Sequence, residues 1–251
     1  LTLAEVLSRY DLEPGDVVRI DTGNYIQSVP TAMGYLDGGT AAEPVTIQGS
    51  TNRAGSVFIG AGVDLANVRG VRLRNLIFKS QTLLADVAAV ASSEDVTFEQ
   101  VDLQGGPRDG FDISLSSNIF LRNFSVSKVA LYGVNSMASF NTRLEFGTLW
   151  SNGTAQVLTR NQTVQGYVSA REDSFVAVSN CVLGAFGVGN PIYEMRGTIR
   201  ANNNDLYRGS DGLAALSYMT GFRQEIDSVG SWTSSEFGQD NASLSHNPRF
   251  A

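Results

Sequence analysis

The sequence predicts an all-β protein, a single-stranded right-handed parallel β-helix of about eight coils with a short N-terminal capping helix and an irregular C-terminal cap. Short strands of alternating apolar and polar residues return at a nearly constant spacing, and one position within them is repeatedly an amide residue. Leucine-rich repeats have a similar period, but they also need a leucine signature and helical segments. Because both are absent, the parallel β-helix is favoured.

The composition is that of a folded domain with many tight turns. The 251 residues include 26 glycines but only 6 prolines, and 42% are hydrophobic, which excludes a disordered chain. The net charge of -7 argues against nucleic acid as the main partner, because phosphate binding needs a basic surface. No apolar run approaches the ~20 residues of a membrane helix, so we expect no membrane insertion.

The first element expected is a short helix. The segment TLAEVLSRY begins with a capping residue, Thr2, followed by apolar residues at helical spacing, and this helix would cover the first coil. We divide the single domain, 1–251, into an N-terminal cap (1–16), coils (17–205) and a C-terminal cap (206–251), where the repeat is lost. Such a domain would also suit one module of a larger protein, with neighbouring domains of the same chain as partners.

One strand of each coil is marked by the repeat itself. Its starts fall at Val71, Val96, Ile119, Thr142, Val176 and Ile199, in steps of 25, 23, 23, 34 and 23 residues. Two weaker members precede them, at Val17 and Val45. We interpret the 34-residue step as an insertion with a strand-like piece of its own, VLTRNQTV.

A second strand precedes each of these by about eight residues. Its members are VDLA (Val63), AAVA (Ala88), FDIS (Phe111), VNSM (Val134), VSAR (Val168) and IYEM (Ile192). Side chains alternate between the two faces of a strand. Inward we expect Val63, Leu65, Phe111, Ile113, Val134 and Val168, and outward Asp64, Asp112, Asn135, Ser169, Arg171, Glu194 and Arg196.

The repeated amide position is architectural in this scheme. Asn75, Gln100, Asn123 and Asn180 fall at one place in their coils, where the chain must bend between two strands. Asparagine tolerates the left-handed backbone of such a bend, and stacked amides can bond from coil to coil. The single cysteine, Cys181, follows one of them in an apolar pattern and is expected to be a buried structural thiol.

Several segments carry a family resemblance. LEPGDVVRIDTGNY (12–25), GGTAAEPVTIQGS (38–50) and GVRLRNLIF (70–78) resemble the opening of carbohydrate-active right-handed β-helix proteins, which include alginate lyase and chondroitinase B-like polysaccharide lyases. PRDGFDISLSSNIFLRN (107–123) resembles a coil of polygalacturonase-type glycosidases. The resemblance implies a polysaccharide as partner and an extracellular, periplasmic or cell-surface location. It also implies a substrate groove along the strand that begins each coil, the series of VDLA, AAVA, FDIS and their equivalents.

The residues near that strand suit lyase chemistry better than hydrolysis. β-Elimination of a uronic acid needs a neutralised carboxylate, a base and an acid. We expect Lys128 and Arg171 to be the base and acid, and Asp109 and Asp112 to be ligands of calcium, the candidate cofactor. The expected substrate contacts are Arg108, Asp109, Asp112, Tyr132, Asn135, Glu194 and Arg196. The paired acidic motif and His-Gly of the glycosidases are missing, and the only histidine, His246, lies in the tail.

Two functions of different classes remain. The first is a lyase, or a related epimerase, that acts on an acidic uronate-containing glycan. The second is a non-catalytic structural, adhesin-like or glycan-binding module of a large extracellular protein. The outward alanines Ala89 and Ala91 and the acidic balance favour the module, whereas the mixed column of Asp, Asn, Arg and Lys favours the enzyme.

Overall fold

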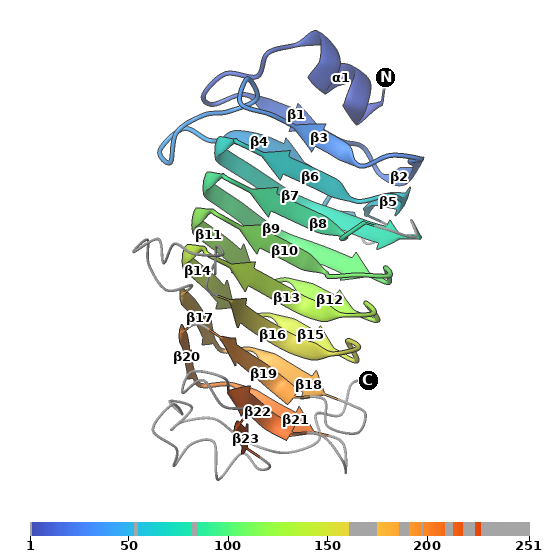
Figure 1. Ribbon diagram of the computed structural model, residues 1–251. Coiled ribbons are helices and arrows are strands. Elements are labelled where there is room, and N and C mark those ends of the chain that lie inside the picture. Colours follow the sequence, from blue (N-terminus) through green and yellow to red (C-terminus); the bar gives the residue numbers. More distant parts are fainter. Residues whose placement is uncertain are drawn as a thin grey trace.

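The computed structural model describes residues 2–52, 55–81, 85–160, 175–185, 191–196, 198–208, 213–217 and 224–226. Short strands follow one another around a single axis, and successive coils stack into an elongated solenoid with the N-terminal helix at one end (Figure 1). The predicted all-β parallel β-helix with a short N-terminal helix is therefore confirmed. None of the helices in these ranges is long and apolar enough to cross a membrane.

One wall of the solenoid is a nine-stranded sheet with one strand from each coil. In spatial order it contains β3 (Thr31–Met33), β6 (Val63–Ala66), β8 (Ala88–Ala91), β10 (Phe111–Ser114), β13 (Tyr132–Met137), β16 (Ala155–Arg160), β19 (Pro191–Arg196), β22 (Leu213–Ser217) and β23 (Gln224–Ile226). All neighbours are parallel except the last pair, β22 and β23. The parallel stack thus continues through β22, beyond the predicted end of the coils at residue 205.

The other wall is a 14-stranded sheet that bends along its length. Its strands before the bend are β1 (Val17–Arg19), β4 (Val45–Gln48), β11 (Ser117–Arg122), β14 (Phe140–Glu145), β17 (Phe175–Ser179) and β20 (Thr198–Asn202). After the bend come β2 (Gly23–Ile26), β5 (Ser56–Gly60), β12 (Ser125–Ser127), β15 (Thr148–Trp150), β18 (Val182–Ala185) and β21 (Asp205–Arg208). β7 (Arg69–Ser80) and β9 (Glu94–Gln104) run through the bend and pair with strands on both sides of it.

The predicted capping helix is α1 (Leu3–Arg9). Thr2 begins it with a capping box, in which its Oγ1 accepts from the backbone N–H of Glu5 at 3.2 Å and its own N–H donates to the Glu5 carboxylate at 2.7 Å. Leu3 and Leu7 pack against the core. The helix therefore covers apolar surface that would otherwise be open at the end of the solenoid.

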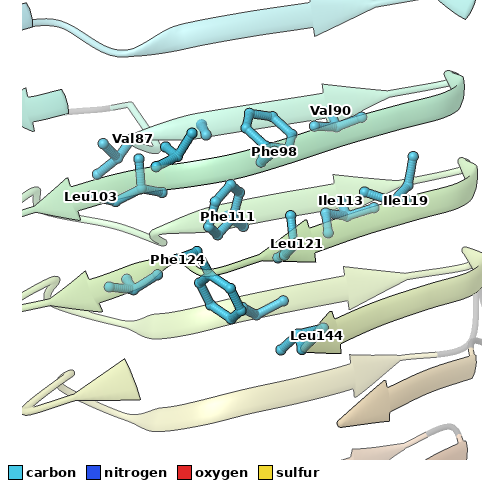
Figure 2. Packing of buried hydrophobic residues seen from close by; sticks show 14 of the residues in the cluster. Val87, Val90, Phe98, Leu103, Phe111, Ile113, Ile119, Leu121, Phe124 and Leu144 are labelled. Atoms are coloured by element: carbon cyan, nitrogen blue, oxygen red, sulfur yellow. The ribbon is translucent and has the colours of Figure 1, made fainter. Parts of the chain in front are cut away.

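The core is a continuous column of apolar side chains between the two walls. Phe111, from the nine-stranded sheet, packs edge-on between Phe98 and Phe124, with ring centroids 5.0 and 6.0 Å away (Figure 2). All three rings are almost completely buried. The inward positions predicted for Val63, Leu65, Phe111, Ile113 and Val134 are confirmed, since each of these side chains is buried.

The bend between the two halves of the larger sheet has the predicted left-handed backbone. Asn75, Gln100, Asn123 and Asn180 have φ values of 54°, 54°, 48° and 53°. Their side chains make no hydrogen bond with described residues, and Nδ2 of Asn75 has no partner. The expected amide ladder is thus not found. The left-handed residue turns its side chain away from the core, and the side chain of the next residue points inward instead.

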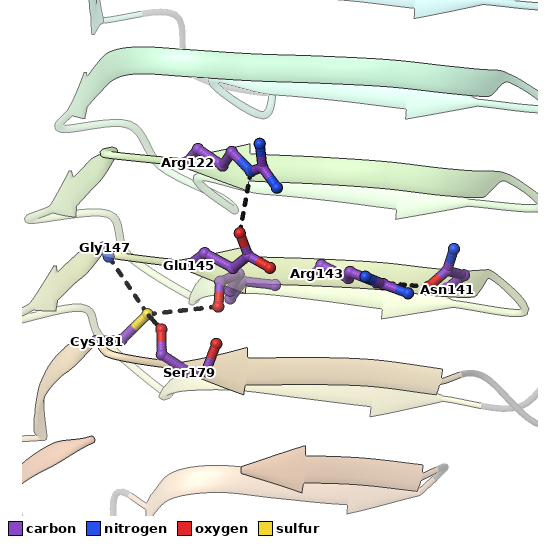
Figure 3. A network of polar contacts seen from close by, with 8 residues as sticks. Arg122, Asn141, Arg143, Glu145, Gly147, Ser179 and Cys181 are labelled. Atoms are coloured by element: carbon purple, nitrogen blue, oxygen red, sulfur yellow. Dashed lines mark hydrogen bonds and ion pairs between the residues drawn. The ribbon is translucent and has the colours of Figure 1, made fainter. Parts of the chain in front are cut away.

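Smaller groups form ladders inside the bends. At one bend the buried serines Ser93, Ser116 and Ser139 stack, and the Oγ of Ser116 accepts from the N–H of Ser93 at 3.0 Å, as Ser139 does from Ser116 at 3.1 Å. At the other, the Sγ of Cys181 accepts from the N–H of Gly147 at 3.3 Å (Figure 3). Cys181 is therefore the buried structural thiol expected from the sequence.

The register differs from the prediction at the insertion. β13 pairs with β16, so AQVLTR (155–160) is the strand of this coil and the predicted VSAR is not. Val168, Ser169 and Arg171 lie outside the described residues. β19 is also shifted by one residue from the predicted start at Ile192, because Tyr193 pairs with Val157 and is fully buried. The insertion thus follows β16 rather than containing it. The repeat length alone could not tell whether 155–160 or VSAR was the strand of this coil.

Candidate functional site

The outward face of the nine-stranded sheet, called the site face below, carries the expected column of side chains. Successive pairing aligns Asp64, Ala89, Asp112, Asn135, Leu158 and Glu194. The predicted outward placement of Asp64, Asp112, Asn135 and Glu194 agrees with this register. Asn135 and Glu194 are only 7% and 5% exposed, and Leu158, which occupies the place expected for Ser169, is fully buried.

Asn135 links the two predicted metal ligands. Its Nδ2 donates to Oδ2 of Asp109 at 2.9 Å and to Oδ1 of Asp112 at 3.1 Å. Asp109 lies just before β10 and Asp112 within it, so they reach Asn135 from the preceding coil. Oδ1 of Asn135 is buried and has no partner among the described residues. The amide therefore has an acceptor available at the centre of the cluster.

Tyr132 begins β13 and joins the same cluster from two sides. Its backbone N–H donates to Oδ1 of Asp109 at 3.0 Å, and its hydroxyl donates to Oε2 of Glu194 at 3.4 Å. Glu194 is 62 residues away in sequence but reaches Tyr132 because the coils stack. The phenol and the carboxylate are therefore placed to exchange a proton.

Asp86 extends the cluster towards the N-terminus and was not predicted. Its Oδ1 accepts from the N–H of Asp109 at 3.0 Å and forms an ion pair with Nε of Arg108 at 3.2 Å. Asp86 precedes Asp109 by 23 residues, as Asp109 precedes Tyr132, so the sequence period could have identified it. Arg108 supplies the one positive charge that is described within this cluster.

Burial raises the pKa of Asp109 above the ordinary aspartate value. Desolvation is the largest cause, and the nearby charge of Asp86 acts in the same direction. The hydrogen bonds from Tyr132 and Asn135 and the charge of Arg108 oppose it. Asp109 therefore holds a proton more tightly in the folded protein than in the unfolded chain.

This shift predicts a pH dependence of stability. Because the folded state binds the proton of Asp109 more tightly, the stability contributed by this group is present at low pH and is lost as the pH rises through the ordinary aspartate pKa to the raised folded value. In Asp109→Asn, this fall in stability should be absent. Thermal unfolding of both proteins across the acid range measures the difference, and parallel curves throughout would contradict the assignment.

The predicted base and acid do not join the cluster among the described residues. Lys128 is exposed at a bend, with a φ of 59°, and has no hydrogen bond or ion pair with described residues. Arg171 lies outside the described ranges. Arg196 occupies the register position beside Arg160, two residues beyond Glu194 in β19.

Calcium remains a prediction. Among the described residues, no group of three or more Asp, Glu, His and Cys is arranged to hold a metal ion. Asp109 and Asp112 face the N–H₂ group of Asn135, which is a donor and not a metal ligand. As they stand, these residues do not fit the ion.

Comparison with known proteins finds solved structures with a similar fold. No family model and no curated protein matches the chain. A PL6-family alginate lyase superposes with a TM-score of 0.52 at 16% identity, over 81% of this chain and 30% of the lyase. Pectate lyase Pel9A superposes with a TM-score of 0.52 at 14% identity, over 86% of this chain and 70% of the lyase. The chain has the parallel β-helix fold of polysaccharide lyases. It spans about 30% of the alginate lyase, and at these identities the likeness concerns the fold alone.

Proposed function

We propose that the chain processes an acidic, uronate-containing polysaccharide outside the cell, as a lyase or a related epimerase, at the site face. One observation carries the proposal: Asp109, Asp112, Tyr132, Asn135 and Glu194, predicted as site residues, form one connected hydrogen-bonded cluster across stacked coils. A structural surface needs no such set of buried and half-buried acids, amide and phenol on its outward side.

The cluster suits removal of the proton beside a uronate carboxylate. Tyr132 passes its hydroxyl proton to Glu194 and takes the proton from C5 of the sugar. The electrons of the broken C–H bond form the C4–C5 double bond, and the C4–O4 bond breaks. The proton held by Glu194 is then available to the departing oxygen. An epimerase shares the first step and returns a proton to the other face of C5.

The remaining groups position the substrate. Arg108, at the edge of the cluster, is the described cation that can pair with the sugar carboxylate, although Asp86 now engages it. The unpartnered Oδ1 of Asn135 can accept from a sugar hydroxyl. Asp109 is 2% exposed and positions Tyr132 and Asn135 by accepting hydrogen bonds from their N–H groups.

An ultraviolet absorbance assay against a panel of polyuronates tests the proposal. Rising absorbance from an unsaturated product is expected with at least one of them, and parallel reactions with calcium and with a chelator test the candidate cofactor. The variant Lys128→Ala tests the base expected from the sequence, which should be dispensable if Tyr132 is the base. Unchanged absorbance, together with unchanged C5 configuration by proton NMR, would refute catalysis.

A non-catalytic glycan-binding or structural module is the second candidate, and Leu158 favours it. This side chain is fully buried and stands in the column between Asn135 and Glu194. An apolar residue in the middle of a sugar-binding column interrupts the polar contacts that a bound polymer would make. If the assay shows no reaction, binding of the same glycans without turnover is the expected result.

A further inference from the structure

The second outward face of interest lies on the other wall of the solenoid. It is called the arginine face here and is formed by the strand segments before the bend, from β4 to β20. Pairing aligns one column of Thr46, Arg72, Thr97, Phe120, Arg143, Ala177 and Arg200, beside a second of Gln48, Arg74, Glu99, Arg122, Glu145 and Ser179. Five arginines and two glutamates therefore share this surface of a protein whose net charge is -7.

Most of these arginines are not neutralised. Arg122 pairs with Glu145 at 3.0 Å, but Nε of Arg143 donates to the amide oxygen of Asn141 at 2.9 Å (Figure 3). Arg72 and Arg74 form no ion pair with any described residue. The face therefore has a local excess of positive charge that the fold does not consume.

A pocket of about 370 Å³ opens between these columns. It is lined by Arg72, Thr97, Glu99, Phe120 and Arg122. Nε of Arg72 is shielded from solvent and has no hydrogen-bond acceptor in the part of the chain that the structure describes. A shielded guanidinium N–H without an acceptor is unfavourable, and a ligand carboxylate or sulfate would satisfy it.

Aromatic rings hold the neighbouring arginines in place. The guanidinium of Arg143 lies over the ring of Phe120, 5.7 Å from its centroid, and that of Arg200 lies over Phe175 at 5.1 Å. Such contacts restrict the long side chains before any ligand arrives. The cations are thus partly pre-organised along the axis of the solenoid.

We propose that the arginine face is a second glycan-binding site, which takes an anionic polysaccharide with carboxylate or sulfate groups lying along the solenoid axis. Coils rise by about 4.8 Å, so Arg72 and Arg143, three strands apart in one column, lie about 14 Å from each other. A repeating polymer can reach both sites, whereas one small anion cannot. The site is separate from the site face, because the two sheets form different walls.

A glycan fits this face better than a nucleic acid does. Glu99 and Glu145 stand among the arginines and would repel a continuous run of phosphates. A uronate chain spreads fewer charges among many hydroxyls. The carboxylates of the same glutamates can accept hydrogen bonds from these hydroxyls, and the hydroxyl of Thr97 can donate or accept. The pattern of cations, acceptors and rings therefore favours a sparsely charged sugar polymer.

Binding of fluorescent polygalacturonate oligomers to the whole chain tests the inference. Arg72→Gln and Arg143→Gln should each weaken binding about tenfold, since each removes a charge-assisted hydrogen-bonding group. Arg9→Gln, which removes the same charge from the exposed end of α1, should bind as the wild type does. Fully methyl-esterified oligomers should bind weakly, and added salt should weaken the binding of the acidic form.

The outcomes separate this inference from the proposed function. Loss of binding in the two face variants supports it even if no polyuronate is cleaved, because the assay measures no turnover. Wild-type affinity in both variants, or an equal loss in Arg9→Gln, would overturn it. So would equally effective displacement by a DNA oligonucleotide of the same total charge. Unfolding curves of Arg72→Gln and Arg143→Gln, compared with that of the wild type, separate a misfolded variant from a weakened site.

Discussion

Replacing Tyr132 with phenylalanine should lower the rate of uronate elimination by about 10²–10⁴-fold, the range for loss of an acid–base group. The substitution removes only the hydroxyl, which lies 3.4 Å from Oε2 of Glu194. The backbone N–H of residue 132 still donates to Asp109, and the ring keeps its place. The melting temperature should therefore remain close to that of the wild type.

The matched variant is Glu194→Gln. It should lower the rate by a similar factor, because glutamine accepts the hydrogen bond but cannot take the proton. In the double variant the losses should not add, since both residues act in one proton transfer. A single variant with full activity would contradict the assignment of the pair, and a large fall in melting temperature would show a structural role.

The largest effect on stability is expected for Phe111→Ala, which should lower the free energy of unfolding by about 3–5 kcal/mol. The ring is fully buried and is enclosed by the edges of Phe98 and Phe124 from neighbouring coils (Figure 2). The backbone on both sides is paired with β8 and β13, so the coil cannot collapse to fill the space. Denaturant-induced unfolding measures the loss.

Phe140→Ala is the control for this substitution. It removes the same side chain from a position that is 50% exposed, where the ring centroid lies 6.5 Å from that of the tilted ring of Phe175. The expected change is below about 1 kcal/mol. Equal losses in the two variants would mean that burial does not decide the stability of the coils.

The repeat made most of the fold predictable. Residues at equivalent positions of successive coils have the same backbone conformation and lie on the same face of the sheet. Alternation of apolar and polar residues was therefore enough to identify the buried side chains Val63, Leu65, Phe111 and Ile113. The left-handed bends at Asn75 and the related positions followed from residue type. Their side-chain bonds did not, because a left-handed φ sends the amide outward and leaves the inward place to the next residue, such as Cys181.

The candidate site was predicted in part. Asp109, Asp112, Tyr132 and Asn135 fall in two consecutive, regular coils, and there the sequence period correctly brought them together. Beyond residue 160 an insertion interrupts the period. VLTR and VSAR fit the strand pattern equally well, and only pairing with β13 decided between them. Lys128 was selected for its chemistry, and the structure places it at an exposed bend.

The sequence by itself determined the coil, its faces and the residues that share a column, because these depend on local alternation and on a nearly constant repeat length. Only the tertiary structure decided which columns become sites. The contact of Tyr132 with Glu194 and the pocket around the shielded Nε of Arg72 both depend on stacking between coils. The first of these contacts joins residues across an insertion of irregular length. In both, distances of a few ångströms between side chains cannot be read from spacing along the chain.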